Sequence, residues 1–498
     1  MAGLNFYVVF CAFAAVLGSI QCGYHIGELN TPKDVMSCKT QPKNENYYYY
    51  SLPDCIPMND AQFGLVTSIF TLGALLGSLL SSRVADYKGR RWTLLANNLF
   101  LGISPLIMGF AGNYSTLIIG RALVGIGCGV VTVVVPMYLA EISPIEYRGA
   151  IGAMNQLGIV AGILFAQIEG LYLSNIPGWR LILLSVSVLS LIQIVFLGLS
   201  VESPRYLISK PGGIHSAKRT LQKLRGSLDI ENELGGWNQI ASDDDTIRLM
   251  PEENVSRSDT DVTNETIPAI STPSPPVVFH ARNHHDDFSV WQFLTSPYYR
   301  APLKVLLLVQ FTQQFSGINA VMYYSTTILS KVLPSSSGLI TVYINVVNFF
   351  MTIISAYLMD KTGRRTLLLY SIGSMSVASA LLGLSIINDY GFLSAFSIIL
   401  YVATFAIGLG PIPFLIIPEI VDTHAAATAG SIGISLNWTT NFVVGFLFLS
   451  FNSMFGGYVF YVFSIYLFVA FLLSERLVPE TKAKTVEEIW NGWTGRVI

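Results

Sequence analysis

Charged residues are scarce in this chain of 498 residues. Only 12% of its residues are Asp, Glu, Lys or Arg and 52% are hydrophobic, whereas soluble domains carry about 25% charged residues. The mean hydropathy is +0.54. A water-soluble protein rarely hides this much apolar surface, so the composition predicts an integral membrane protein. The net charge of −2 argues against a nucleic-acid partner.

The sequence also lacks the motifs of several common sites. No Cys/His spacing typical of zinc and no P-loop occur. We therefore expect no metal, no cofactor and no catalytic residue, and an enzyme is disfavoured. A basic N-terminal region and a clear cleavage site are absent too, so residues 1–24 are predicted to be a first spanning helix rather than a signal peptide.

Only five cysteines are present. Cys11, Cys22 and Cys128 fall in apolar segments, where a small thiol is expected to pack against its neighbours. Cys38 and Cys55 flank a polar loop. A disulfide between them requires that the loop face an oxidising space, and the sequence leaves both states open.

Apolar segments long enough to cross a bilayer recur along the chain. Backbone groups in lipid must be paired within their own element, which favours helices, and about 20 residues make one span. The predicted spans are 4–24, 62–81, 92–111, 116–139, 150–172, 180–200, 302–329, 338–359, 366–388, 392–418, 428–450 and 456–474. We therefore predict an all-α polytopic membrane protein with twelve transmembrane helices in two six-helix bundles.

A polar segment, residues 205–300, separates the two groups of spans. Its first part, His215 to Arg225, has the pattern of a short amphipathic helix. Residues 228–287 are acidic and rich in Ser, Thr and Pro, which predicts disorder. The predicted organisation is a first bundle, a cytosolic segment, a second bundle and a cytosolic tail: residues 1–204, 205–300, 301–478 and 479–498.

The predicted orientation follows from basic residues. The short loops on one side of the predicted membrane carry more Lys and Arg than those on the other. The central segment and the C-terminal tail lie on that richer side. Because basic loops stay in the cytosol, both termini and the central segment are predicted to be cytosolic.

An internal repeat supports a duplicated unit. The pattern D-x-x-G-R-R follows the second span as Asp86 to Arg91 and the eighth span as Asp360 to Arg365. A basic loop that only fixes topology is the alternative explanation. Recurrence at matched places favours two pseudo-symmetric halves, and each half also ends in an acidic–basic turn, ESPR or PETK.

The charged residues of these loops suit a cytosolic latch between the halves. Each surface ion pair contributes only about 0–1 kcal/mol, but a network can bias an equilibrium worth a few kcal/mol. The predicted latch residues are Asp86, Arg90, Arg91, Glu141, Arg148, Glu202, Arg205, Asp360, Arg364, Arg365, Glu419 and Glu480.

Several motifs together resemble those of the sugar porter family of the major facilitator superfamily. They are GRALVGIGCGVVTVVVPMYLAEISPIEYRG, VESPRYL, QQFSGINAVMYYS, DKTGRR, GPIPF and PETK. The resemblance covers nearly all of the chain except about 228–287. It implies two six-helix bundles that hold a sugar near the middle of the bilayer and rock around it.

The resemblance also implies a set of sugar-binding residues. Animal facilitative glucose transporters bind sugar hydroxyls with side-chain amides, which donate and accept hydrogen bonds without a charge. The alternative is that these amides bond only to other helices. The matching amides here are Gln156, Gln313, Gln314, Asn319, Asn348 and Asn441, and the matching aromatic residues are Phe405 and Trp438.

The chain departs from the family at some of these positions. Phe414 stands where the family has a tryptophan, and Ala406 stands where the animal proteins have an acidic residue. The expected partner is therefore a sugar or polyol of unspecified identity, with the bilayer around the protein and no obligate protein partner.

Span one contains CGYHIGELNTP, in which His25 and Glu28 lie one turn apart on a helix. Proton-coupled sugar porters carry Asp at the position of His25, and animal uniporters often carry Asn. Histidine titrates near neutral pH, and ionisable residues in spans are functional candidates. One interpretation is a proton-coupling site. The other is that His25 bonds a neighbour and Glu28 is solvated at the helix end.

The sequence also bears on which membrane holds the protein and on whether the protein carries or senses sugar. The GYHxxELNxP form resembles that of fungal vacuolar-membrane sugar porters, which favours the vacuolar membrane over the plasma membrane. A sugar sensor with the same fold is the alternative to a carrier. Sensors tend to have long cytosolic tails, and the tail of about 20 residues after Pro479 favours a carrier, either a uniporter or a proton-coupled one.

Overall fold

The computed structural model describes residues 5–39, 52–144, 147–210, 213–227, 290–422, 425–482 and 484–494. Within these ranges it contains twelve helical spans long and apolar enough to cross a membrane, which confirms the predicted fold class. The predicted disordered segment 228–287 lies outside the described residues.

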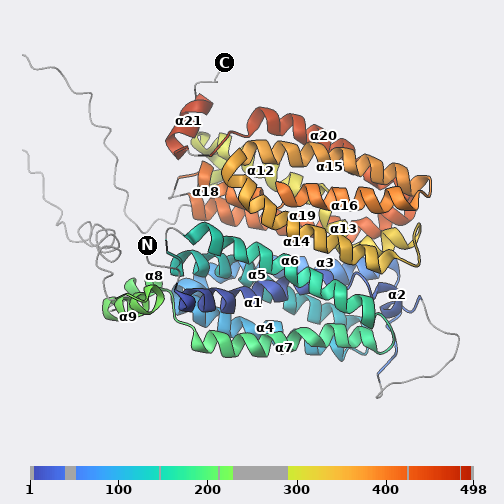
Figure 1. The fold of residues 1–498 in the computed structure, drawn as a ribbon, viewed down its shortest axis with the longest axis horizontal. Helices are drawn as coiled ribbons and strands as arrows, with labels where there is room; N and C mark the ends of the chain where they lie inside the picture. Colours follow the sequence, from blue (N-terminus) through green and yellow to red (C-terminus); the bar gives the residue numbers. More distant parts are fainter. Residues whose placement is uncertain are drawn as a thin grey trace, which may run out of the picture.

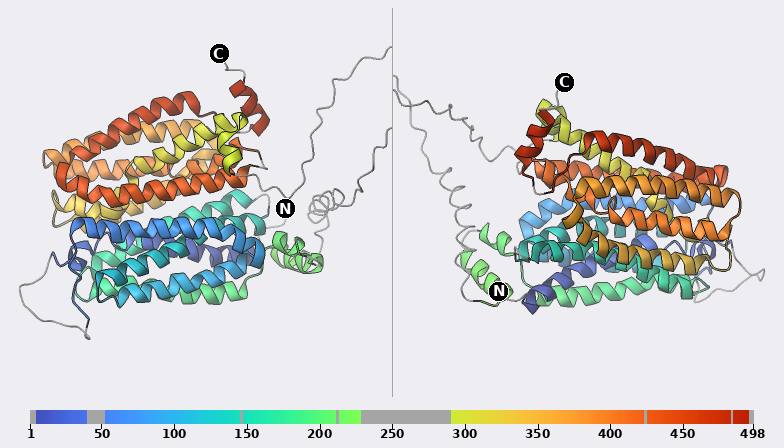
Figure 2. Two further views of the ribbon diagram at one scale, coloured as in Figure 1. Left: turned by 180° about the vertical axis from the view of Figure 1, so that it is seen from behind. Right: turned by 45° about the horizontal axis from the view of Figure 1, so that its top comes forward.

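The spans form two bundles, which lie side by side in all three views (Figures 1 and 2). The first half is coloured blue to green and consists of α1 (Phe6–Gly27), α3 (Asp60–Lys88), α4 (Arg90–Gly109), α5 (Tyr114–Ile142), α6 (Arg148–Leu173) and α7 (Gly178–Leu199). The second half is coloured yellow to red and consists of α12 (Arg300–Phe315), α13 (Ile318–Ser330), α14 (Ser337–Thr362), α15 (Arg364–Ile387), α16 (Gly391–Ile407), α19 (Ala426–Phe455) and α20 (Tyr458–Leu477).

Small residues let helices approach closely inside each half. A Cβ atom on Gly77 of α3 would lie 2.1 Å from the carbonyl oxygen of Ile126, and one on Gly129 of α5 would lie 2.1 Å from that of Ala74. Only glycine fits at such distances, as is common where membrane helices pack. The outer surface instead exposes large apolar side chains such as Val195 and Phe392, which a bilayer solvates.

Two of the predicted spans are present but consist of broken helices. The span predicted at 302–329 consists of α12 and α13, separated by Ser316 and Gly317, and Gly317 has a φ of +87° that ends the first helix. The span predicted at 392–418 consists of α16, α17 (Ile412–Leu415) and α18 (Ile417–Ile420). The prolines of GPIPFLIIP lack the N–H groups that a continuous helix needs.

The two ends of the molecule differ in charge and in content. The basic end carries both D-x-x-G-R-R loops and the short helices α8 (Pro204–Ile208), α9 (Ile214–Arg225), α11 (Val290–Thr295), η2 (Pro297–Tyr299) and α21 (Val486–Thr494). Helix α9 matches the predicted amphipathic helix. The disulfide end, at the opposite side of Figure 1, carries α2 (Lys33–Met36) and a disulfide between Cys38 and Cys55, whose Cα atoms are 5.3 Å apart.

The halves meet along a seam formed by three helix pairs. Helix α3 packs against α19, α6 packs against α14, and α1 contacts α13. The amides singled out from the sequence lie on helices of this seam or next to it.

Candidate functional site

A cluster of buried amides lies where the broken helices of the second half meet. Gln313 of α12 donates from Nε2 to the carbonyl oxygens of Leu409 (3.0 Å) and Gly410 (2.8 Å). Those carbonyls belong to the break after α16, where the helix leaves backbone groups without a regular partner. Gln313 therefore satisfies a helix break, and its own Oε1 accepts from Nδ2 of Asn437 at 2.5 Å.

Asn437 of α19 holds this cluster together. Its Nδ2 also donates to Oε1 of Gln310 (2.8 Å), and its Oδ1 accepts from Nε2 of Gln314 (2.9 Å). Gln314 in turn accepts at Oε1 from Nδ2 of Asn319. Gln310 and Asn437 are not among the site residues predicted from the sequence. The spacing of amides at 310, 313 and 314 places three of them on one helix face and could have indicated the cluster.

Other amides keep hydrogen-bonding groups free. The side chains of Gln156, half-buried on α6, and Asn348, buried on α14, form no hydrogen bond with any described residue. Asn441 accepts from the Tyr323 hydroxyl at 3.2 Å, and its Nδ2 has no partner among the described residues. The same holds for Oδ1 of Asn319. These groups are the ones available to a ligand.

The two aromatic candidates line the same region. Trp438 lies between Asn437 and Asn441 on α19 and meets Phe70 of the first half edge-on, with ring centroids 6.1 Å apart. Phe405 is half-buried at the end of α16, beside the backbone of Gly410. Their predicted stacking on a sugar stays a prediction.

A buried ionic cluster lies in the first half. His25, Glu28 and Arg121 all have an exposed fraction of 0%. Glu28 binds Arg121 (Oε1 to Nη1, 2.7 Å) and His25 (Oε2 to Nδ1, 2.9 Å). The interpretation that Glu28 is solvated at the helix end is wrong, because the end of α1 is covered by other helices. Nε2 of His25 has no partner among the described residues.

Arg121 is a member of this cluster that was not among the residues predicted from the sequence. Its guanidinium also donates to the carbonyl oxygens of His25 (2.9 Å) and Val66 (3.3 Å) and lies 4.8 Å from the ring centroid of Phe70. A lone arginine inside the apolar run GRALVGIG was the available signal. It makes the cluster a link between α1, α3 and α5.

The predicted latch residues of the first half cluster at the basic end. Arg90 forms ion pairs with Asp86 (3.1 Å) and Glu141 (2.9 Å). The carboxylate of Glu202 accepts from the backbone N–H groups of Arg90 (2.8 Å) and Arg91 (2.9 Å), at the start of α4. A carboxylate at a helix N-terminus satisfies free N–H groups and complements the helix dipole.

The second half repeats this arrangement. Glu480 accepts from the backbone N–H groups of Arg364 (2.9 Å) and Arg365 (3.2 Å), and Arg364 pairs with Glu419 at 3.1 Å. The glycine of each D-x-x-G-R-R loop has a positive φ, 101° at Gly89 and 92° at Gly363. The repeated sequence therefore builds the same carboxylate-capped helix start twice.

A latch between the halves is absent from the described residues. Each ion pair there joins two residues of one half, because the carboxylates are engaged by arginines and helix starts nearby. Arg148 and Arg205 are exposed and bond to no described side chain. The side chain of Asp360 lies outside the described residues. Pairing across the halves stays a prediction for a state in which the basic end is closed.

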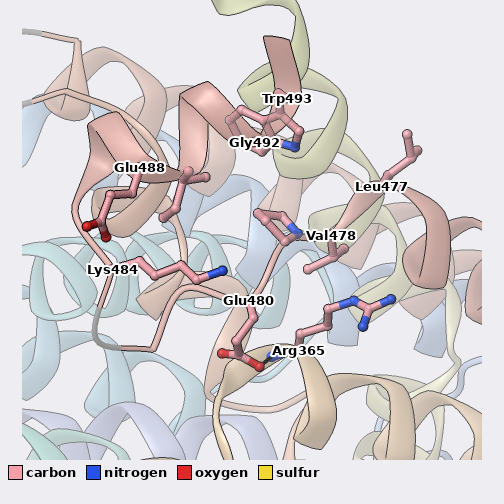
Figure 3. Close-up of a pocket in the computed structure, with 10 residues that line it drawn as sticks. Arg365, Leu477, Val478, Glu480, Lys484, Glu488, Gly492 and Trp493 are labelled. Carbon is pink, nitrogen blue, oxygen red and sulfur yellow. Dashed lines mark hydrogen bonds between the residues drawn. The ribbon is translucent and has the colours of Figure 1, made fainter. Parts of the chain in front are cut away.

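A cavity of about 310 Å³ opens beside the charged cluster around Glu480 in the second half (Figure 3). Arg365, Glu480 and Lys484 line it together with Glu488 and Trp493 of α21. It lies at the basic end, outside the seam and away from the amide cluster, so it is not the site that the amides form.

At the disulfide end the seam is closed around a lysine. Lys33 is 3% exposed and pairs with Asp60 at 3.3 Å. Its Nζ lies 5.7 Å from the ring centroid of Phe63 in the first half and 6.0 Å from that of Tyr324 in the second. Burial lowers the pKa of Lys33, and the charge of Asp60 opposes that shift.

Comparison with known proteins identifies relatives over the whole chain. A family model described as sugar (and other) transporter matches residues 11–248 and 277–493. A probable metabolite transport protein of Saccharomyces cerevisiae is 34% identical over 498 residues, covering 98% of this chain and 96% of that protein. Facilitated glucose transporter member 3 of solute carrier family 2 from Ovis aries is 33% identical over 504 residues, covering 98% of this chain and 93% of that protein.

Solved structures match the fold. The inward open conformation of the xylose transporter from E. coli has a TM-score of 0.75 at 22% identity and covers 98% of this chain and 100% of that chain. The proton:xylose symporter bound to 6-bromo-6-deoxy-D-glucose has a TM-score of 0.67 at 22% identity, and the match covers 98% of this chain and 99% of that chain.

Proposed function

The chain belongs to the family of sugar (and other) transporters, and from this premise we propose that it carries a hexose or a related sugar or polyol across a membrane by alternating access. The observation that carries the proposal is the set of free amide groups at the seam, on Gln156, Asn348 and Asn441. Sugar hydroxyls are neutral, and they are best bound by neutral groups that both donate and accept hydrogen bonds. A ligand that lacks a hydroxyl would leave a buried amide unpaired, so it would bind more weakly.

Within the site, the amides have two roles in this proposal. Gln313 and Gln314 are held by Asn437 and by backbone carbonyls. They therefore position the site. Their N–H groups are already engaged, so Gln314 adds to the binding of hydroxyls only through the lone pair that its Oε1 keeps. Asn319, Asn348 and Asn441, with Gln156 from the first half, contact the sugar directly. Phe405 and Trp438 cover its apolar C–H faces.

The two bundles, residues 1–204 and 301–478, are the units that rock. The seam is closed at the disulfide end around Lys33, whereas each ion pair at the basic end stays within one half. A seam that is closed at the disulfide end and not held by ion pairs at the basic end supports a state in which a sugar enters the site from the basic end. The basic loops support a cytosolic position for that end, for residues 205–300 and for the tail 479–498.

Proton coupling is the finer part of the proposal. A proton on His25 or Glu28 changes the charge that faces Arg121 in a fully buried cluster. A change of one charge in such a place alters the stability of the surrounding packing by several kcal/mol at most. Translocation that depends on this charge would make the protein a proton-coupled carrier, and independence from it would make the protein a uniporter.

The decisive experiment is uptake of labelled glucose and a panel of hexoses and polyols into liposomes that contain the purified protein. Each sugar is measured with and without an imposed pH gradient. Accumulation against the sugar gradient demonstrates a proton-coupled carrier, and equilibration alone demonstrates a uniporter. No flux of any sugar through folded protein contradicts the carrier and favours a sensor with the same fold.

We place the protein in the vacuolar membrane rather than the plasma membrane. The support is the GYHIGELNTP segment of residues 23–32, with its resemblance to fungal vacuolar-membrane sugar porters. A fluorescent fusion imaged against vacuolar and plasma-membrane dyes tests this. Fluorescence confined to the plasma membrane would overturn the vacuolar assignment. It would leave the proposed transport function unchanged.

A further inference from the structure

The cavity at the basic end lies between two helices of the second half and the C-terminal helix α21 (Figure 3). Its apolar walls include Leu477 of α20 and Trp493 of α21. Its volume of about 310 Å³ falls within the range of small-molecule sites, about 300–1,000 Å³. Four charged side chains complete the lining: Arg365, Glu480, Lys484 and Glu488.

The two carboxylates of this cavity are engaged by backbone N–H groups. Glu480 accepts four such bonds of 2.9–3.2 Å, two of them from the first residues of α15. Glu488 accepts from the backbone N–H of Thr485 at 3.1 Å, directly before α21. A carboxylate at a helix start is balanced by the free N–H groups and the helix dipole. In the part of the chain that the structure describes, neither carboxylate forms an ion pair with Arg365 or Lys484.

The two cations of the cavity keep hydrogen-bond donors free. Nζ of Lys484 has no partner among the described residues, and Figure 3 shows it pointing away from Glu488, toward the side that Arg365 lines. The Arg365 guanidinium donates from Nη2 to the carbonyl oxygen of Glu475 at 2.7 Å. Its other side-chain N–H groups have no partner within the described ranges. Guanidinium and ammonium groups that offer free donors are the groups that bind phosphate oxygens in proteins.

Trp493 adds a flat apolar surface to this polar lining. In Figure 3 its ring lies apart from the charged ends of Lys484 and Glu480. A small-molecule site typically combines apolar and aromatic walls with a few placed polar groups. The C–H face of a sugar or inositol ring suits the Trp493 ring, and a phosphate group on such a ring suits the cations.

The cavity borders the surface that faces lipid. Leu473 is 44% exposed on α20, one turn before Leu477, and Tyr370 is 59% exposed on α15, between one and two turns after Arg365. Large apolar side chains exposed on the outside of a membrane bundle are solvated by the bilayer. A lipid headgroup and a soluble molecule can therefore both reach the cavity.

We propose that this cavity binds a phosphate monoester carried on a sugar or inositol ring. Arg365 and Lys484 donate to the phosphate oxygens, and Trp493 covers the ring. This chemistry has two sources, a phosphoinositide headgroup in the adjacent leaflet and a soluble sugar phosphate. The cavity lies away from the amide cluster, so the proposal does not depend on the proposed transport of sugar.

Binding is measured by calorimetry on the purified full-length protein in nanodiscs of phosphatidylcholine. The probes are inorganic phosphate, glucose 6-phosphate and a short-chain phosphatidylinositol 4-phosphate, at one ionic strength and with saturating glucose present to occupy the amide cluster. We expect both esters to bind more tightly than inorganic phosphate, because only they have a ring for Trp493 to cover. Tighter binding of the lipid supports the headgroup as the source, and tighter binding of glucose 6-phosphate supports a soluble ester.

Lys484→Met removes one cation from the cavity. It should weaken the binding of both esters about tenfold, the loss expected for one charge-assisted hydrogen bond. Lys484 is exposed, so its replacement leaves the fold intact. Lys482→Met is the matched control, because Nζ of Lys482 donates to the carbonyl oxygen of Lys361 (2.7 Å) and Lys482 does not line the cavity. Its affinities should equal those of the parent.

Trp493→Leu tests the contact with the ring. It should weaken the binding of both esters and leave that of inorganic phosphate unchanged. Equal affinity for the esters in the parent and in Trp493→Leu would overturn the role given to Trp493. The whole proposal is overturned if the parent binds none of the three probes, or if Lys484→Met binds the esters as tightly as the parent does.

Discussion

Glu28 and Arg121 form an ion pair 2.7 Å long in which both side chains are fully buried. The pair joins the end of α1 to the first third of α5, and His25 and Phe70 contact its charged groups. Two buried charges stabilise a fold only while both are present, because removal of one leaves the other without a counter-charge.

The first prediction follows from this pair. Arg121→Leu should lower the unfolding temperature of the purified protein strongly, since breaking a buried pair costs about 3–5 kcal/mol. The double variant Arg121→Leu/Glu28→Leu should recover part of that loss, because the unpaired carboxylate is gone. Thermal unfolding followed by intrinsic fluorescence measures both. Equal destabilisation by the single and double variants would contradict the argument.

The second prediction concerns pH. If the cluster couples transport to protons, His25→Asn should flatten the pH dependence of sugar uptake, because Asn cannot titrate near neutrality. His215→Asn is the control, since His215 is exposed on α9 at the basic end. Uptake by liposomes is measured from pH 5 to 8. An unaltered profile in His25→Asn removes His25 from the coupling mechanism.

The third prediction separates binding amides from positioning amides. Asn348→Ala should weaken sugar binding about tenfold with little change in the unfolding temperature, because the side chain bonds to no described residue and is free for a ligand. Gln313→Ala should lower both the affinity for sugar and the unfolding temperature, because it leaves the carbonyls of Leu409 and Gly410 unpaired. Binding is measured by calorimetry. Unchanged binding in Asn348→Ala would reject its place in the site.

The fourth prediction tests the repeated loops. Gly363→Ala should destabilise the protein by about 1–3 kcal/mol, because its φ of 92° strains any other residue and the Glu480 carboxylate lies 2.7 Å from the position of the new Cβ. Gly430→Ala is the matched control, since it lies in helix α19 with open space at the Cβ position. Gly430→Ala should be neutral or slightly stabilising. Equal unfolding temperatures for both variants would contradict this account.

The sequence by itself determined the class and the general plan of the protein. Twelve apolar segments and scarce charge required a helical membrane protein, because lipid leaves few other ways to pair a backbone. The repeated D-x-x-G-R-R loops indicated two related halves, and the amides at 313, 314 and 319 stood out as polar residues within an apolar span. These are local patterns, and composition and spacing are enough to find them.

Only the tertiary structure decided which polar groups are paired. Asn437 and Arg121 looked like residues of ordinary spans, and they proved to hold the amide cluster and the ionic cluster, through contacts with residues more than 90 positions away. Asn30 gave no signal as a contact between the halves, because its partners on α13 lie almost 300 residues further along the chain. Such pairing depends on how folded helices face each other, which the periodicity of a single segment does not contain.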